Sequence, residues 1–185
     1  MRKGNYLNFF PVLPVIRIDI STWLAIPVLL VLIILQMVVS HRFTLIHGMA
    51  DLMLLGLCAW SVQKNVRNAW QWAIIGGLMA GYVSAFSWYI PVLGYLIVVG
   101  LAMLLRRRLW QVPILAMFIL TFLGTLLFNM ALLTVLRLQN VSIPLLEALN
   151  KITLPSLLLN FILAIPFFAL FSELADWIYP EELEV

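Results

Sequence analysis

The chain has 185 residues, of which 64% are apolar and only 10% are charged. An ordinary soluble domain carries about 25% charged residues, so too few polar residues remain here to cover a soluble core. A lipid bilayer can cover the apolar surface instead. A spanning helix needs about 20 mostly apolar residues, which leaves room for about six helices joined by short loops. We therefore expect an all-α, polytopic membrane protein with six transmembrane helices.

The net charge of +3 does not point to nucleic acid as a partner, because the basic residues are spread between apolar stretches. The single cysteine, Cys58, lies inside an apolar run and is expected to be a small packed side chain. The first apolar stretch comes late, is long enough to span a bilayer and lacks a small-residue cleavage site. We therefore expect no cleavable signal peptide.

Apolar runs predict the spans in chain order. Residues 1–20 mix charged and apolar side chains and contain two prolines, which favours a cytoplasmic segment at the membrane surface. The transmembrane domain follows at 21–179, and an acidic cytoplasmic tail occupies 180–185. The predicted spans are 23–40, 43–63, 69–86, 89–105, 110–136 and 154–171.

The segment 137–153 allows two interpretations. Ser142 and Pro144 suit the start of a helix, and apolar residues recur on one face after them. The first interpretation is a short amphipathic helix lying in the membrane interface. The second is a plain loop between the last two spans.

Lysine and arginine predict the orientation, because these residues accumulate on the cytoplasmic side. With a cytoplasmic N-terminus, eight of the eleven fall inside, namely Arg2, Lys3, Arg17, Lys64, Arg67, Arg106, Arg107 and Arg108. We therefore expect a multi-pass protein of the bacterial cytoplasmic membrane with both termini in the cytoplasm. Aromatic residues near span ends are expected in the headgroup layer: Trp23, Trp70, Trp72, Trp88, Trp110, Trp177 and Tyr179.

Asp51 is the one carboxylate predicted to lie inside the membrane. A buried charge is costly there, so such a residue is a functional candidate. The alternative is that the second span begins near Met49, which makes Asp51 a first-turn residue stabilised by the helix dipole.

Small residues form two rows in the third span. Gly76, Ala80 and Ser84 make one row, and Gly77, Gly81 and Ala85 make the other. Such rows let another helix approach closely, either within this bundle or from a partner protein.

Other polar residues also have two interpretations each. Arg106, Arg107 and Arg108 are expected to set the topology and contact anionic lipid, or to dock a cytoplasmic partner. Asn129 and Asn160 are expected to hydrogen-bond neighbouring helices or to line a ligand pocket. His41 and His47 lack helical pairing, so a surface role is favoured over a metal pair. We find no catalytic motif and expect no enzyme activity, no metal and no cofactor.

Three stretches resemble the family of the bacterial rod shape-determining protein MreD. They are Ala50-Asp51-Leu52, the glycine-rich span followed by Pro91-Val92-Leu93-Gly94-Tyr95, and Leu154-Pro155-Ser156-Leu157-Leu158-Leu159-Asn160-Phe161. One departure is that the family usually carries an aspartate near the end of the third span, where this chain reads Val83-Ser84-Ala85-Phe86. Any role of that aspartate is not carried over.

The resemblance implies a non-enzymatic membrane subunit of the cell-wall elongation (rod) complex, which makes peptidoglycan. It implies binding to the bitopic protein MreC, and indirect association with MreB, with RodA and with its transpeptidase partner. It also implies a six-helix fold similar to the substrate-binding subunits of energy-coupling-factor transporters.

That similarity supplies a second hypothesis, in which the chain is the membrane subunit that binds a vitamin in such a transporter. A binder of this class should surround a midplane cavity with several polar and aromatic groups. The spans offer Asn129, Asn160 and scattered serines, so the sequence favours the rod-complex subunit.

Overall fold

All elements in the described part of the chain are helical. The computed structural model describes residues 20–42, 49–64, 66–84, 87–108, 111–138 and 144–179. The helices are α1 (Ile20–Arg42), α2 (Leu52–Val62), α3 (Ala69–Val83), α4 (Tyr89–Arg108), α5 (Pro113–Leu138), α6 (Leu145–Ala148), η1 (Leu149–Thr153) and α7 (Leu154–Ile178). The all-α prediction is confirmed for these ranges. Most of the N-terminal segment and the acidic tail, with His47 and Trp110, lie outside them.

Three helical segments in these ranges are long and apolar enough to cross a membrane, which makes the chain a membrane protein. They are Tyr89–Arg108, Pro113–Leu138 and Leu146–Ile178. The apolar parts of α1 and α2 are shorter, and α3 has 15 residues. By length and composition, three helices among the described residues could span a membrane, where the sequence led us to expect six spans.

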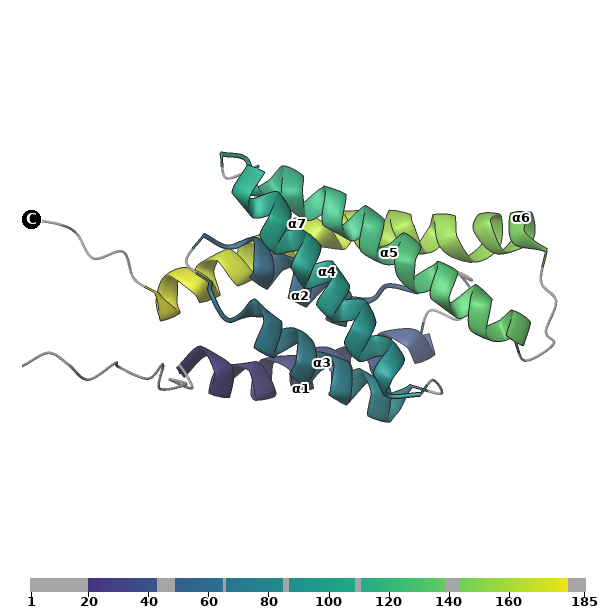
Figure 1. Cartoon of the computed structure of the whole chain (residues 1–185), viewed down its shortest axis with the longest axis horizontal. Helices are drawn as coiled ribbons and strands as arrows, with labels where there is room; N and C mark the ends of the chain where they lie inside the picture. The colour runs from purple at the N-terminus through teal and green to yellow at the C-terminus, as the bar shows by residue number, and fades with distance from the viewer. Residues whose placement is uncertain are drawn as a thin grey trace, which may run out of the picture.

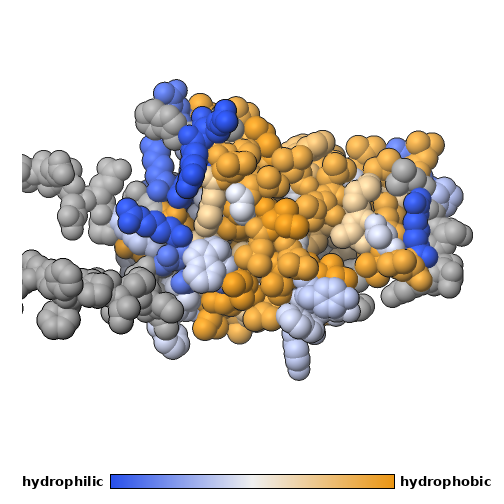
Figure 2. Space-filling model, viewed as in Figure 1, coloured by the Kyte–Doolittle hydropathy of each residue, from blue (hydrophilic) through white to orange (hydrophobic). Residues whose placement is uncertain are grey.

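The surface agrees with a membrane location. Figure 2 shows apolar side chains covering the middle of one face, while hydrophilic side chains gather toward its two ends. Large apolar residues point outward along α1 and α7, including Val31, Val38, Leu158 and Ile162. Lipid can cover these residues at no cost, because its chains are as apolar as they are.

Helix α2 lies at the centre of the bundle. In Figure 1 it runs behind α4, between the pair α1 and α3 and the pair α5 and α7, and it contacts all five of these helices. All of its 11 residues are buried. A helix of this length extends about 16 Å, roughly half the hydrocarbon thickness.

The predicted second span, 43–63, is therefore too long at its start. Met49, Ala50 and Asp51 are not helical, and the helix begins only at Leu52. Periodicity cannot separate a helix buried among other helices from a spanning one, because both appear as continuous apolar runs.

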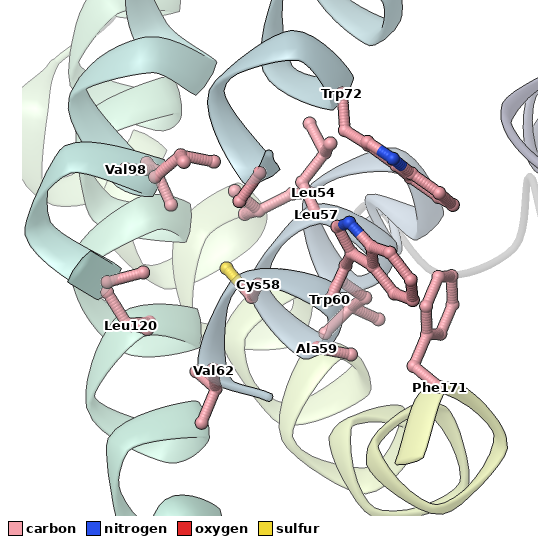
Figure 3. Close-up of a cluster of buried hydrophobic side chains, with 14 of the residues drawn as sticks. Leu54, Leu57, Cys58, Ala59, Trp60, Val62, Trp72, Val98, Leu120 and Phe171 are labelled. Atoms are coloured by element: carbon pink, nitrogen blue, oxygen red, sulfur yellow. The ribbon is translucent and has the colours of Figure 1, made fainter. Parts of the chain in front are cut away.

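An aromatic cluster joins α2 to α3 and α7. The rings of Trp60 and Trp72 stack with their centroids 4.3 Å apart, and Phe171 meets both edge-on (Figure 3). Trp72, which the sequence predicts in the headgroup layer, is completely buried among side chains of the bundle. The predicted interfacial residues Trp23 and Trp177 are exposed at the outer ends of their helices.

The segment before α7 is helical and continues into it. A single α-helical turn, α6, is followed by η1, which is a π-helical turn. At its end, the N–H of Leu154 donates to the carbonyl of Leu149. Neither a plain loop nor a separate amphipathic helix describes residues 145–153. Pro155 comes directly afterwards, and a proline cannot donate to the helical hydrogen-bond ladder. The α-helical hydrogen-bond pattern is thus interrupted where the π-helical turn η1 meets α7.

Candidate functional site

Asp51 caps the buried start of α2. Its Oδ1 accepts a hydrogen bond from the N–H of Leu54 at 2.9 Å, which satisfies one of the donors that a helix start leaves free. Gln36 of α1 satisfies another, because its Oε1 accepts from the N–H of Met53 at 3.1 Å. Of the two interpretations of Asp51, the structure shows the residue at the helix start, and it also places this start deep among other helices.

Helix α7 holds the chain just before α2. The N–H of Met49 donates to the hydroxyl of Ser156, and the N–H of Asp51 donates to Oδ1 of Asn160, each at 3.0 Å. The amide nitrogen of Asn160 then donates to the hydroxyl of Thr125 on α5 at 2.8 Å. Asn160 is almost completely buried. It therefore links three segments of the bundle, as expected for an amide in an apolar span.

Tyr95 of α4 completes the arrangement, because its hydroxyl hydrogen-bonds the side chain of Asp51. Gln36 lies six residues before the last residue of α1, and Tyr95 lies six residues after the first residue of α4. Six residues correspond to about 9 Å of helix. Asn160 lies further from the end of its helical segment, because α6 and η1 precede α7. The side chains that surround the start of α2 thus come from the interior of three helices.

Two adjoining cavities lie beside the start of α2. One has a volume of about 420 Å³ and extends between α1, α3, α4 and α5, and the other has about 210 Å³ and extends toward α7. Both are lined by Gln36, Met49, Asp51, Phe128 and Leu132. Asn129 lines the smaller one. The start of α2 is therefore both a structural junction and the wall of a cavity.

Sequence reasoning missed three members of this site: Gln36, Tyr95 and Thr125. A signal for Gln36 was present, because it is an amide inside a long apolar run, as Asn129 and Asn160 are. Thr125 gave no comparable signal, since threonine is common in membrane helices. Tyr95 stands in the stretch Pro91-Val92-Leu93-Gly94-Tyr95, but the sequence assigned it no role of its own. The polar groups around the cavity are consequently more numerous than the sequence led us to expect.

The two small-residue rows of α3 are used inside the bundle. A Cβ atom on Gly77 would lie 2.5 Å from Cα of Val92, and one on Gly81 would lie 2.7 Å from Cα of Trp88. This row therefore brings the backbones of α3 and α4 together. In the other row, a Cβ on Gly76 would lie 3.3 Å from the sulfur of Met53 on α2. Ala80, one turn later, is partly buried and lines the larger cavity.

The three arginines that end α4 have different surroundings. Nη1 of Arg106 donates to the carbonyls of Gln63 and Val66, at 2.8 and 2.5 Å, and so binds the segment that follows α2. Arg107 and Arg108 are exposed. Lipid contact is therefore open to the last two, whereas Arg106 is engaged by this chain.

No metal-binding group of three or more His, Cys, Asp or Glu residues occurs in the described ranges. What the geometry brings together is one carboxylate, several amides and hydroxyls, and two aromatic rings beside a cavity. Comparison of the chain with protein-family models, with curated proteins and with solved structures gives no match.

Proposed function

We propose that this chain is a non-enzymatic membrane subunit of a bacterial cell-wall elongation complex, which binds an MreC-like bitopic protein and helps maintain rod shape. One observation carries the proposal. All three stretches that resemble the MreD family meet at the start of α2. Asp51 binds Asn160 of the last stretch and Tyr95 of the middle one, and Gly76 of the glycine-rich span packs on Met53. Residues far apart in sequence thus form one structural unit.

This convergence supports the resemblance because chance matches to short apolar motifs would have no reason to meet in space. The motif residues also differ in what they contact. The small residues of α3 pack against this chain's own helices, so a bulky change there would act on the fold before it acted on a partner. The partner is expected to contact outward-facing side chains instead.

The orientation within the proposal is both termini in the cytoplasm and six membrane crossings. In Figure 1 the start of α1 and the end of α7 lie at the same end of the bundle. Thr22 bonds Gln71 there, near the starts of α1 and α3, and Arg106 binds the end of α2. Basic residues that follow α2 and end α4 favour this end as the cytoplasmic one.

A reporter fusion tests the orientation. Alkaline phosphatase fused after Val185 should be inactive, because this enzyme needs the periplasm, and a green fluorescent protein fused at the same position should be bright. The same reporters fused in the segment between α5 and α6 should give the opposite pattern. An active phosphatase at the C-terminus would overturn the orientation without touching the rod-complex assignment.

The function is tested by depletion and co-purification. Depleting the protein should turn rods into round cells, and the tagged full-length chain should retain an MreC-like protein after detergent extraction. Asn160→Ala should complement the depletion poorly, whereas Leu158→Ala, on the exposed face of the same helix, should restore rods. Normal cell shape on depletion, with no MreC-like protein retained, contradicts the proposal.

The second candidate is the substrate-binding subunit of an energy-coupling-factor vitamin transporter, which the cavity of about 420 Å³ favours. Its volume falls in the usual range for small-molecule sites. Against it, Gln36, Asn160 and Tyr95 already hydrogen-bond residues at the start of α2. Few donors remain for a ligand as polar as a vitamin. A stoichiometric vitamin in the purified protein, with normal cell shape on depletion, would favour this candidate.

A further inference from the structure

The cavity beside Asp51 is lined by a carboxylate. The described residues that line the two adjoining cavities include no lysine, arginine or histidine. The larger cavity is otherwise mainly apolar, with Met37, Met49 and Met53 among its walls. An anionic ligand would meet the carboxylate without any compensating charge. A ligand that fits this cavity is therefore neutral or positive at the end that reaches Asp51.

The carboxylate keeps part of its capacity to accept hydrogen bonds. An ionised carboxylate offers about four acceptor positions. The N–H groups of Leu54 and Met53 and the hydroxyl of Tyr95 occupy three of them. The remaining position suits one N–H group of a small donor.

Two aromatic rings add a second feature that selects a cation. Tyr95 and Phe128 both line the larger cavity, and their ring centroids are 4.8 Å apart with an angle of 41° between the planes. Aromatic faces attract ammonium groups, and the attraction grows when water is excluded. A carboxylate and a pair of aromatic rings in one cavity are the chemical elements of an ammonium site.

We propose that the cavity at the start of α2 binds an organic ammonium group attached to an apolar chain. The ammonium group lies between Asp51 and the rings of Tyr95 and Phe128, and the apolar chain lies along the methionines and the aliphatic side chains of α1 and α5. This proposal stands apart from the rod-complex function and holds for either candidate function. The ammonium group comes either from an aminophospholipid headgroup or from a soluble alkylamine.

The test uses the purified full-length chain in detergent and native mass spectrometry. Phosphatidylethanolamine and phosphatidylglycerol with identical acyl chains provide the lipid probes. Hexylammonium and hexanol provide the soluble probes, because they differ in charge but share the chain length. We expect one ammonium ligand per chain, retained in clear preference to its uncharged or anionic counterpart. Binding of phosphatidylethanolamine identifies the lipid source, and binding of hexylammonium alone identifies a soluble one.

Substitutions locate the site. Asp51→Asn keeps a side chain that caps helices well but removes the charge, so ammonium binding should weaken about 30-fold or more. Phe128→Leu keeps the carboxylate and should weaken binding between about 2-fold and about 30-fold. Glu173→Gln makes the same carboxylate-to-amide change on the exposed surface of α7 and should bind as the unchanged protein does.

Two results overturn the proposal. One is equal retention of the charged and uncharged probes by the unchanged protein. The other is ammonium binding that survives Asp51→Asn and Phe128→Leu alike. If Asp51→Asn fails to fold, Phe128→Leu and the comparison of hexylammonium with hexanol still decide the question.

Discussion

The backbone N–H of Asp51 donates to the side-chain oxygen of Asn160 at 3.0 Å, across 109 positions of the sequence. This bond joins the start of the central helix α2 to α7. It also brings together two of the residues that the sequence marks as polar exceptions in apolar surroundings.

Replacing Asn160 by alanine should destabilise the bundle. The change removes the acceptor for Asp51 and the donor for Thr125, and it leaves a buried N–H without a partner. We expect a loss of about 1–3 kcal/mol in the free energy of unfolding. Unfolding in mixed detergent micelles, followed by circular dichroism, measures it. Leu158→Ala, on the outer face of the same helix, should change stability by much less; equal losses would argue against the buried bonds.

Replacing Gly81 by alanine should separate α3 from α4. The added Cβ would lie 2.7 Å from a backbone atom of Trp88, which cannot rotate away as a side chain can. We expect a loss of about 1–3 kcal/mol, as is usual for overpacking. Gly100 provides the matched control, since a Cβ there meets nothing within 4 Å and alanine favours the helix. A Gly81→Ala protein as stable as Gly100→Ala would show that the contact is not close.

Replacing Arg106 by alanine should loosen the segment after α2. The carbonyls of Gln63 and Val66 would lose their shared donor. Hydrogen exchange by mass spectrometry should then show faster exchange of the amides in 63–68. Arg108→Ala removes the same charge from an exposed side chain and should leave this exchange unchanged. If both variants behave alike, charge at this end matters and the two hydrogen bonds do not.

Replacing Trp60 by phenylalanine should be tolerated better than its burial suggests. Its indole nitrogen is buried and has no hydrogen-bond partner in the described structure, so phenylalanine removes no hydrogen bond. We expect a cost of less than about 1.5 kcal/mol, against about 3–5 kcal/mol for alanine, which also removes the stacking on Trp72. Thermal unfolding of the two variants provides the comparison. A phenylalanine variant as unstable as the alanine variant would indicate a partner for the nitrogen.

The sequence predicts much of the helix arrangement, because the length of an apolar run indicates the length of the helix that it forms. The predicted spans 69–86, 89–105 and 110–136 lie close to α3, α4 and α5, apart from Ala85, Phe86 and Trp110, which lie outside the described residues. The predicted last span, 154–171, begins with α7 but ends seven residues before it. The helix continues past the acidic residues Glu173 and Asp176 to Ile178.

The site was predicted in part. Asp51 and Asn160 were identified because a polar group in an apolar run is costly unless it has a partner. Their partnership could not be predicted, because no local pattern says which helices face each other. Tyr95 was missed for the same reason. The hydrogen bonds of Arg106 could not be predicted for the same reason, because they join it to carbonyls 43 and 40 positions away in the sequence.

The shortness of α2 has a consequence for how the protein is made. At 11 residues, this helix by itself cannot partition into a bilayer as an independent segment during synthesis. Several polar groups at its start are satisfied by side chains from α1, α4 and α7. Two of those helices are synthesised after it. The hydrogen bonds at the centre of the bundle are therefore complete only after α7 has been synthesised.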